Sequence, residues 1–132
     1  DRWVLAGVVV AAVVAVDCTF TDGDDHYDLS PLTRMAGEPN FIYDDAGTTW
    51  HVNVCADVTD TQCSMPTPVC QELSFDGAFA CGVLDTQQIS PGGGGGAKGV
   101  NVMYSGGDDQ PSCPSPRDAT LAISCDEQLM DV

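Results

Sequence analysis

The chain has 132 residues, which is enough for one domain with a single modest core. Its formal net charge at pH 7 is −16, from 20 acidic and 4 basic residues, so it would repel a phosphate backbone, which argues against DNA or RNA as a partner. Seven cysteines in so short a chain indicate disulfides and an oxidising compartment, and no two cysteines have the C-x2-C spacing that is typical of zinc sites.

The N-terminus carries an uninterrupted apolar run of fourteen residues at positions 3–16, WVLAGVVVAAVVAV. This run is shorter than the roughly 20 residues that a membrane-spanning helix needs. It follows Arg2 and ends in small residues, which is typical of the hydrophobic part of a secretory signal peptide. We therefore expect a leader over residues 1–16, with cleavage just after Ala15, and a folded domain over residues 17–132. The alternative is that the apolar run forms a buried first strand.

The next segment is acidic. Asp22, Asp24 and Asp25 do not have the order of ligands, glycine and distal glutamate that an EF-hand loop requires, so we interpret them as a solvated turn. The sequence predicts no metal site and no other cofactor. Further on, Ser30-Pro31 predicts a turn, which Leu29 and Leu32 would anchor to the core.

Residues 48–54, TTWHVNV, show the clearest strand pattern of the chain. Trp50, Val52 and Val54 alternate with polar residues and predict a core-facing side. The opposite side, with His51 and Asn53, is expected to face solvent, and His51 is interpreted as a strand residue rather than a ligand or a catalyst.

The C-terminal half predicts further strands separated by breaks. Residues 73–84 suggest a hairpin, the five glycines at 92–96 a loop tip, and residues 100–104 and 119–123 two more strands. The last two flank a loop that contains Cys113, with Arg117 at its exit. Since no helical periodicity stands out, we predict an all-β sandwich or flattened barrel.

Several motifs together carry a family resemblance. They are YDLSPLTR at 27–34, NVC at 53–55, YSGGD at 104–108, and an arginine, Arg117, eight residues before Cys125. Over residues 18–126 the chain resembles a mannose 6-phosphate receptor homology (MRH) domain, and among these the repeats of the cation-independent mannose 6-phosphate receptor. The resemblance implies two crossed antiparallel sheets stabilised by disulfides.

The resemblance also implies a sugar site and a disulfide. In the family, an arginine at the position of Arg117 and a glutamine at the position of Gln71 hydrogen-bond a mannose ring. The family pairing implies a Cys18–Cys55 disulfide, while the short loop between Cys63 and Cys70 itself favours a second one.

Two features of the family are missing from this chain. Two further strands normally supply a glutamate and a tyrosine to the sugar site, and neither follows Cys125 at the family spacing, so the sequence reads as an MRH domain without its last strands. The partners of Cys113 and Cys125 are missing with them. The loop before Cys113 also lacks the metal-ligating aspartate and the phosphate-contacting histidine of the cation-dependent receptor.

These observations predict a lectin-like, non-enzymatic module in the lumen of the secretory pathway (Golgi or endosome) or outside the cell. Its partners would be mannose-type N-glycans on glycoproteins, with mannose 6-phosphate as one candidate, in the sorting of secretory and lysosomal glycoproteins. Membrane contact would need a segment that this chain does not contain. The alternative is a repeat with a structural or protein-binding role and no bound sugar. A hydrolytic enzyme would rest only on His26, His51 and the cysteines, and we expect none.

Overall fold

A computed structural model describes residues 16–75, 77–92, 98–109 and 116–124. The described chain forms three antiparallel sheets. The first is a hairpin of β1 (Thr19–Asp22) and β2 (Asp25–Asp28). The second is a four-stranded meander of β3 (Phe41–Asp45), β4 (Thr48–Val52), β5 (Val69–Leu73) and β6 (Gly77–Ala80). The third contains β7 (Gln88–Pro91), β8 (Gly99–Tyr104) and β9 (Ala119–Ser124). Two 3₁₀ turns, η3 (Ser30–Leu32) and η4 (Leu84–Thr86), lie in the connections between strands.

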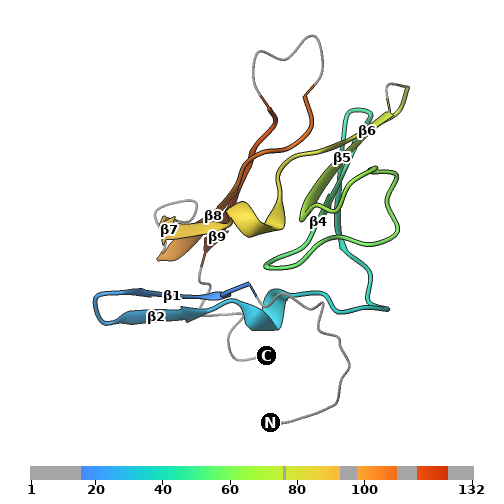
Figure 1. Ribbon diagram of the computed structural model, residues 1–132. Helices are drawn as coiled ribbons and strands as arrows, with labels where there is room; N and C mark the ends of the chain where they lie inside the picture. Colours follow the sequence, from blue (N-terminus) through green and yellow to red (C-terminus); the bar gives the residue numbers. More distant parts are fainter. Residues whose placement is uncertain (1–15, 76, 93–97, 110–115, 125–132) are drawn as a thin grey trace, which may run out of the picture.

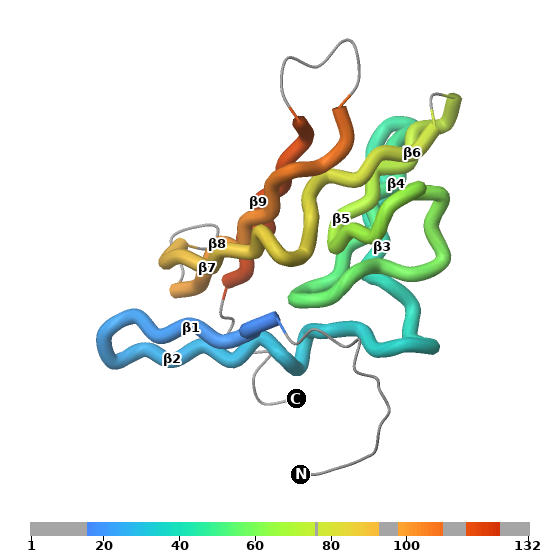
Figure 2. Tube along the Cα trace, in the orientation of Figure 1, coloured from blue at the N-terminus to red at the C-terminus, as the bar shows by residue number. Residues whose placement is uncertain are grey.

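The predicted all-β antiparallel fold is confirmed, although the sheets do not close into a barrel. The four-stranded and three-stranded sheets stand side by side, and the β1–β2 hairpin lies across one end of them (Figures 1 and 2). The core lies between the sheets. Its buried members are Leu29, Val54, Cys55, Val69, Cys81, Val100, Val102 and Tyr104.

The alternation predicted for the last strands is present. Val100, Val102 and Tyr104 of β8 are buried, and the partly buried Leu121 and Ile123 of β9 pack against the same core. The glycine run lies in the connection between β7 and β8, and its residues 93–97 are outside the described residues, as are the leader at 1–15, the loop at 110–115 and residues 125–132. No helix in the described ranges is long and apolar enough to span a membrane.

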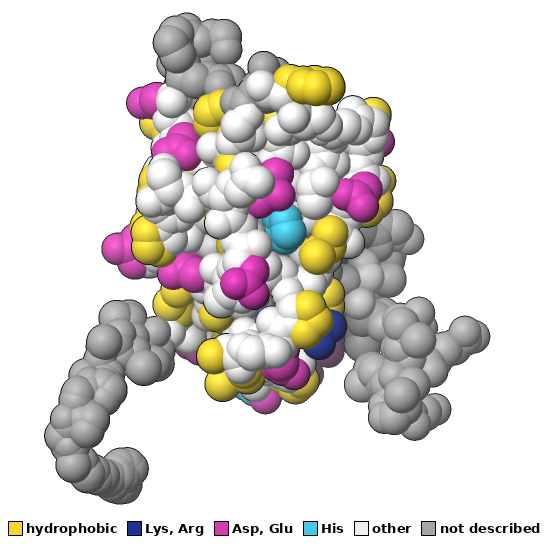
Figure 3. Space-filling model, turned by 90° about the vertical axis from the view of Figure 1, so that its right-hand side faces the viewer, with side chains coloured by type: hydrophobic (Ala, Val, Ile, Leu, Met, Phe, Trp, Pro, Cys, Tyr) yellow, Lys and Arg dark blue, Asp and Glu magenta, His cyan; other side chains and the backbone are white. Residues whose placement is uncertain are grey.

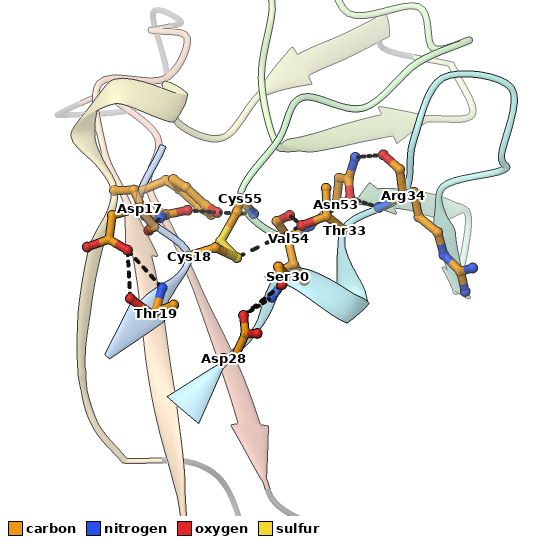
Figure 4. Close-up of a disulfide and its surroundings, with 12 residues drawn as sticks. Asp17, Cys18, Thr19, Asp28, Ser30, Thr33, Arg34, Asn53, Val54 and Cys55 are labelled. Carbon is orange, nitrogen blue, oxygen red and sulfur yellow. Dashed lines mark hydrogen bonds between the residues drawn. A yellow bond between two sulfur atoms is a disulfide. The ribbon is translucent and has the colours of Figure 1, made fainter. Parts of the chain in front are cut away.

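The N-terminal hairpin is tied to the end of β4 (Figure 4). Cys18 and Cys55 form the expected disulfide, and the Leu29 amide donates to the Cys18 carbonyl oxygen at 2.8 Å. Leu29 is buried, as predicted. The same prediction is wrong for Leu32, which is 37 % exposed, because η3 places it on the solvent side.

One face of β4 differs from the prediction. Trp50, Val52 and Val54 do contact the core, but His51 and Asn53 are buried instead of facing solvent, with exposed fractions of 9 % and 1 %. The reason is that these polar side chains have partners from distant segments. His51 Nε2 lies 3.1 Å from Glu72 Oε1, and Asn53 hydrogen-bonds the backbone of residues before and after β4.

The surface reflects the composition. Acidic side chains are spread over the face of the molecule shown in Figure 3, and basic side chains are visible only at its lower right. A positively charged group is therefore a distinctive feature wherever it occurs on this domain.

Candidate functional site

Gln71, one of the two predicted sugar-binding residues, lies in the middle of a row that crosses the four-stranded sheet. In β5 it is opposite Trp50 of β4 and Phe79 of β6, and Trp50 is in turn opposite Tyr43 of β3. Residues directly opposite in antiparallel strands place their side chains on the same face of the sheet. The four residues therefore form one row, which we call the cross-strand row: Tyr43, Trp50, Gln71 and Phe79.

The cross-strand row marks the place where the core-facing side of the sheet becomes accessible. Two residues further along the strands, Val52 and Val69 lie on the same face and pack in or against the core. In the row itself, Trp50, Gln71 and Phe79 are only partly buried, and Tyr43 is 63 % exposed. The row thus combines three aromatic rings with one amide on a surface that solvent can reach.

Arg117, the second predicted residue, joins this row at its β6 end. Its guanidinium carbon lies 4.4 Å from the centroid of the Phe79 ring, which is a cation–π distance. Gln71 is directly opposite the same phenylalanine. The structure therefore brings Gln71 and Arg117 together around Phe79, although Gln71 lies in the four-stranded sheet and Arg117 lies just before β9 of the three-stranded sheet.

The segment 104–108 sets the position of Arg117. It begins at Tyr104, whose hydroxyl donates to Gln87 Oε1 at 2.6 Å and accepts from the Cys55 amide at 3.2 Å. Burial raises the pKa of Tyr104 to about 12, so this phenol remains a neutral donor and acceptor. Gly106 then has a φ of +75°, in the left-handed region that favours glycine.

Gly107 and Asp108 attach this segment to both β6 and Arg117. The Asp108 amide donates to the Ala80 carbonyl oxygen at 2.8 Å, and Asp108 Oδ2 accepts from the Ala80 amide at 2.8 Å. The Gly107 amide donates to the Arg117 carbonyl oxygen at 2.9 Å, and the Arg117 amide donates to the Asp108 carbonyl oxygen at 3.2 Å. A Cβ atom at Gly107 would lie 2.4 Å from the Ala80 carbonyl oxygen, so only glycine fits. The YSGGD motif is therefore what places Arg117 beside β6.

Two other groups near the row have structural rather than reactive surroundings. Cys81 is unpaired and buried, and burial raises the pKa of its thiol to about 11, with the charge of Arg117 partly opposing the shift. A thiol of that pKa is mostly protonated at neutral pH and is a poor nucleophile. His51 lies on the opposite face of the sheet from Gln71, since it is opposite Cys70, which pairs with Cys63 in the second disulfide.

The sequence did not indicate Tyr43, Trp50 and Phe79 as members of a site. Trp50 was assigned to the core-facing side of its strand, but the cross-strand register decides which residues it meets. That register depends on how the strands pair, and β4 and β5 are joined by the long connection 53–68 rather than by a tight turn, so local alternation does not specify it. In the described ranges, no group of three or more His, Cys, Asp or Glu side chains is arranged to hold a metal ion.

A family model described as the cation-independent mannose-6-phosphate receptor repeat matches residues 5–111. The matched region includes Gln71 and the whole of segment 104–108, while Arg117 lies beyond its end. A search of curated proteins found no match. The family match covers most of the chain and agrees with its antiparallel fold, so the chain belongs to the family of cation-independent mannose-6-phosphate receptor repeats.

Proposed function

We propose that this domain is a lectin-like, non-enzymatic module that binds mannose-type glycans at Gln71, Phe79 and Arg117. The observation that carries the proposal is the meeting of Gln71 and Arg117 at one phenylalanine ring. Family membership supports the same function, because the family is named for a receptor of a phosphorylated mannose.

The chemistry of the three side chains suits a sugar. A guanidinium offers donors in a fixed planar arrangement, which matches two neighbouring hydroxyl oxygens, and the Gln71 amide supplies one donor group and one acceptor. Stacking on Phe79 restrains the guanidinium plane before a ligand arrives. The rings of Phe79 and Trp50 provide apolar surface for the C–H face of a pyranose.

The proposal includes a cellular setting. Two disulfides in the described residues indicate an oxidising compartment, that is, the secretory pathway or the exterior of the cell. We propose the Golgi or endosomal lumen, where the domain would bind mannose-type N-glycans of glycoproteins that are being sorted. In this proposal residues 1–16 are a leader, and residues 17–132 form the domain.

An Arg117→Lys variant tests the site. Lysine keeps the charge but does not offer paired planar donors, so we expect its affinity for mannose-type glycans to fall at least about tenfold, or about 1.4 kcal/mol, with an unchanged melting temperature. Glycan-array binding followed by calorimetry on the secreted protein would measure this. The matched control is Lys98→Arg at an exposed ion pair with Asp25, which should leave binding unchanged.

Equal glycan binding by the wild type and Arg117→Lys would refute this site. The absence of any glycan binding would instead favour the alternative, a repeat with a structural or protein-binding role.

A further inference from the structure

We propose that the outer edge of β3 binds an extended, basic segment of another protein, which pairs with β3 as a further strand of the four-stranded sheet. The binding would use backbone groups of β3, with lysine or arginine side chains of the partner opposite the acidic end of the strand. The proposal goes beyond glycan binding and does not depend on it.

The first observation is that the edge of β3 is open. β3 is an outer strand of its sheet, and it pairs with β4 in an unbroken one-to-one register from Phe41 to Asp45. On the other side of β3, no hydrogen bond from another described residue reaches its backbone. The opposite edge of the sheet is closed, because Asp108 makes two hydrogen bonds to the backbone of Ala80 in β6. Of these two edges, β3 alone is left as a template for a further strand.

The turn between β3 and β4 identifies the backbone groups that face outward. Its two residues, Ala46 and Gly47, have φ values of +49° and +89°, which is typical of a type I′ hairpin. In such a hairpin the pair next to the turn is hydrogen-bonded, and hydrogen-bonded pairs then alternate along the ladder. Tyr43 therefore bonds to β4, while the N–H and C=O groups of Ile42 and Asp44 point away from the sheet. Strand addition uses groups in this arrangement.

The side chains of β3 are accessible on both faces of the sheet. Ile42 is 56 % exposed and Tyr43 is 63 % exposed, although both are large and mainly apolar. Ile42 lies on the face of His51, and Tyr43 lies on the face of the cross-strand row. β3 contains no lysine, proline or bulge, which are features that commonly prevent edge strands from pairing. A partner strand would therefore find apolar contacts on both faces besides the backbone hydrogen bonds.

The charge of the strand favours a basic partner over a second copy of this chain. Asp44 and Asp45 are exposed at the turn end of β3, and a second copy would bring a further net charge of −16 to this edge. Opposite charges on paired strands are stabilising and like charges are destabilising. Arg34 stacks on Phe41 at the other end of β3, which is about 13 Å away at about 3.3 Å per residue. The basic residues of the partner therefore belong opposite the two aspartates.

The test uses a capped peptide, acetyl-Thr-Lys-Lys-Val-Val-Thr-Thr-amide, which in antiparallel pairing places its lysines opposite Asp45 and Asp44. We expect saturable binding to the wild-type protein in an NMR titration, with slowed amide hydrogen exchange at Ile42 and Asp44. N-methylation of the peptide residues opposite Ile42 and Asp44 should abolish binding, because their N–H groups would donate to β3. N-methylation opposite Tyr43, where the N–H group points away from β3, should leave most of the binding.

Variants of the protein test the same edge. Ile42→Pro removes an outward N–H group but no hydrogen bond to β4, so it should abolish peptide binding and leave the melting temperature nearly unchanged. Asp45→Asn should lower the affinity by roughly twofold to fivefold. The matched control Asp85→Asn removes the same charge from an exposed position in η4 and should have a much smaller effect.

The proposal is overturned if the peptide does not bind at millimolar concentration, or if binding survives the two blocking methylations. It is also overturned if Asp85→Asn lowers the affinity as much as Asp45→Asn, since the peptide would then respond only to net charge. A dimer in sedimentation experiments that Ile42→Pro dissociates would assign the edge to a second copy instead. The methylated peptides are tested on the wild-type protein, so they decide the question even if Ile42→Pro fails to fold.

Discussion

Replacing Asn53 by alanine should destabilise this domain more than any exposed polar substitution. The Asn53 side chain makes four hydrogen bonds. It accepts from the Arg34 and Val54 amides, each at 2.8 Å, and it donates to the carbonyl oxygens of Arg34 and Asp57, each at 3.0 Å. Because Asn53 is 1 % exposed, water cannot readily replace the lost amide.

The magnitude follows from these bonds. A net contribution of about 0.5–1.5 kcal/mol for each, together with backbone groups left without partners, gives a loss of about 3–5 kcal/mol in the free energy of unfolding. For a domain of this size, that loss lowers the melting temperature by more than about 10 °C. Asn40 is the matched control, since it makes two hydrogen bonds to the Thr59 backbone near the surface, where water can take its place. We expect Asn40→Ala to cost less than about 1 kcal/mol.

Denaturant unfolding of both variants, with the disulfides intact, measures the difference. The reasoning is refuted if the two variants differ by less than about 1 kcal/mol. It is also refuted if Asn53→Ala unfolds at the denaturant concentration of the wild type.

Two further predictions concern residues near β6, at the Arg117 end of the cross-strand row. Gly107→Ala introduces a Cβ atom that clashes with the Ala80 carbonyl oxygen, so we expect the free energy of unfolding to fall by about 1–3 kcal/mol and glycan binding to weaken through a displaced Arg117. The control Ser105→Ala, at an exposed position nearby, should change neither, and a Gly107→Ala variant with wild-type stability and binding would contradict the positioning role. Burial raises the pKa of the Cys81 thiol to about 11, which disfavours the reactive thiolate. A thiol reagent at pH 8 should therefore label Cys81 slowly in the folded protein and rapidly after unfolding. Equal labelling rates, measured by mass spectrometry of the Cys81 peptide, would contradict its burial.

Local alternation was sufficient to predict β4, β8 and β9, because strands that pack one face on a core show a period of two in their apolar residues. It failed for His51 and Asn53 because their partners, Glu72 and the backbone of Arg34, are distant in sequence. A polar residue with long-range hydrogen bonds looks the same in a sequence as one that faces water. The cross-strand row was not predictable for a related reason, since it depends on register.

The two ends of the row are positioned in the same way, and this bears on how the site would work. Asn53 clamps the backbone of Arg34, and Gly107 with Asp108 clamps the backbone of Arg117; each guanidinium then stacks on a phenylalanine of an outer strand of the same sheet. In both cases hydrogen bonds to the arginine's own backbone hold the residue in place. A ligand would therefore meet donors that are already oriented, and little side-chain entropy would be lost on binding. Loosening the Gly107–Asp108 clamp should consequently weaken glycan binding at Arg117 even where the domain stays folded.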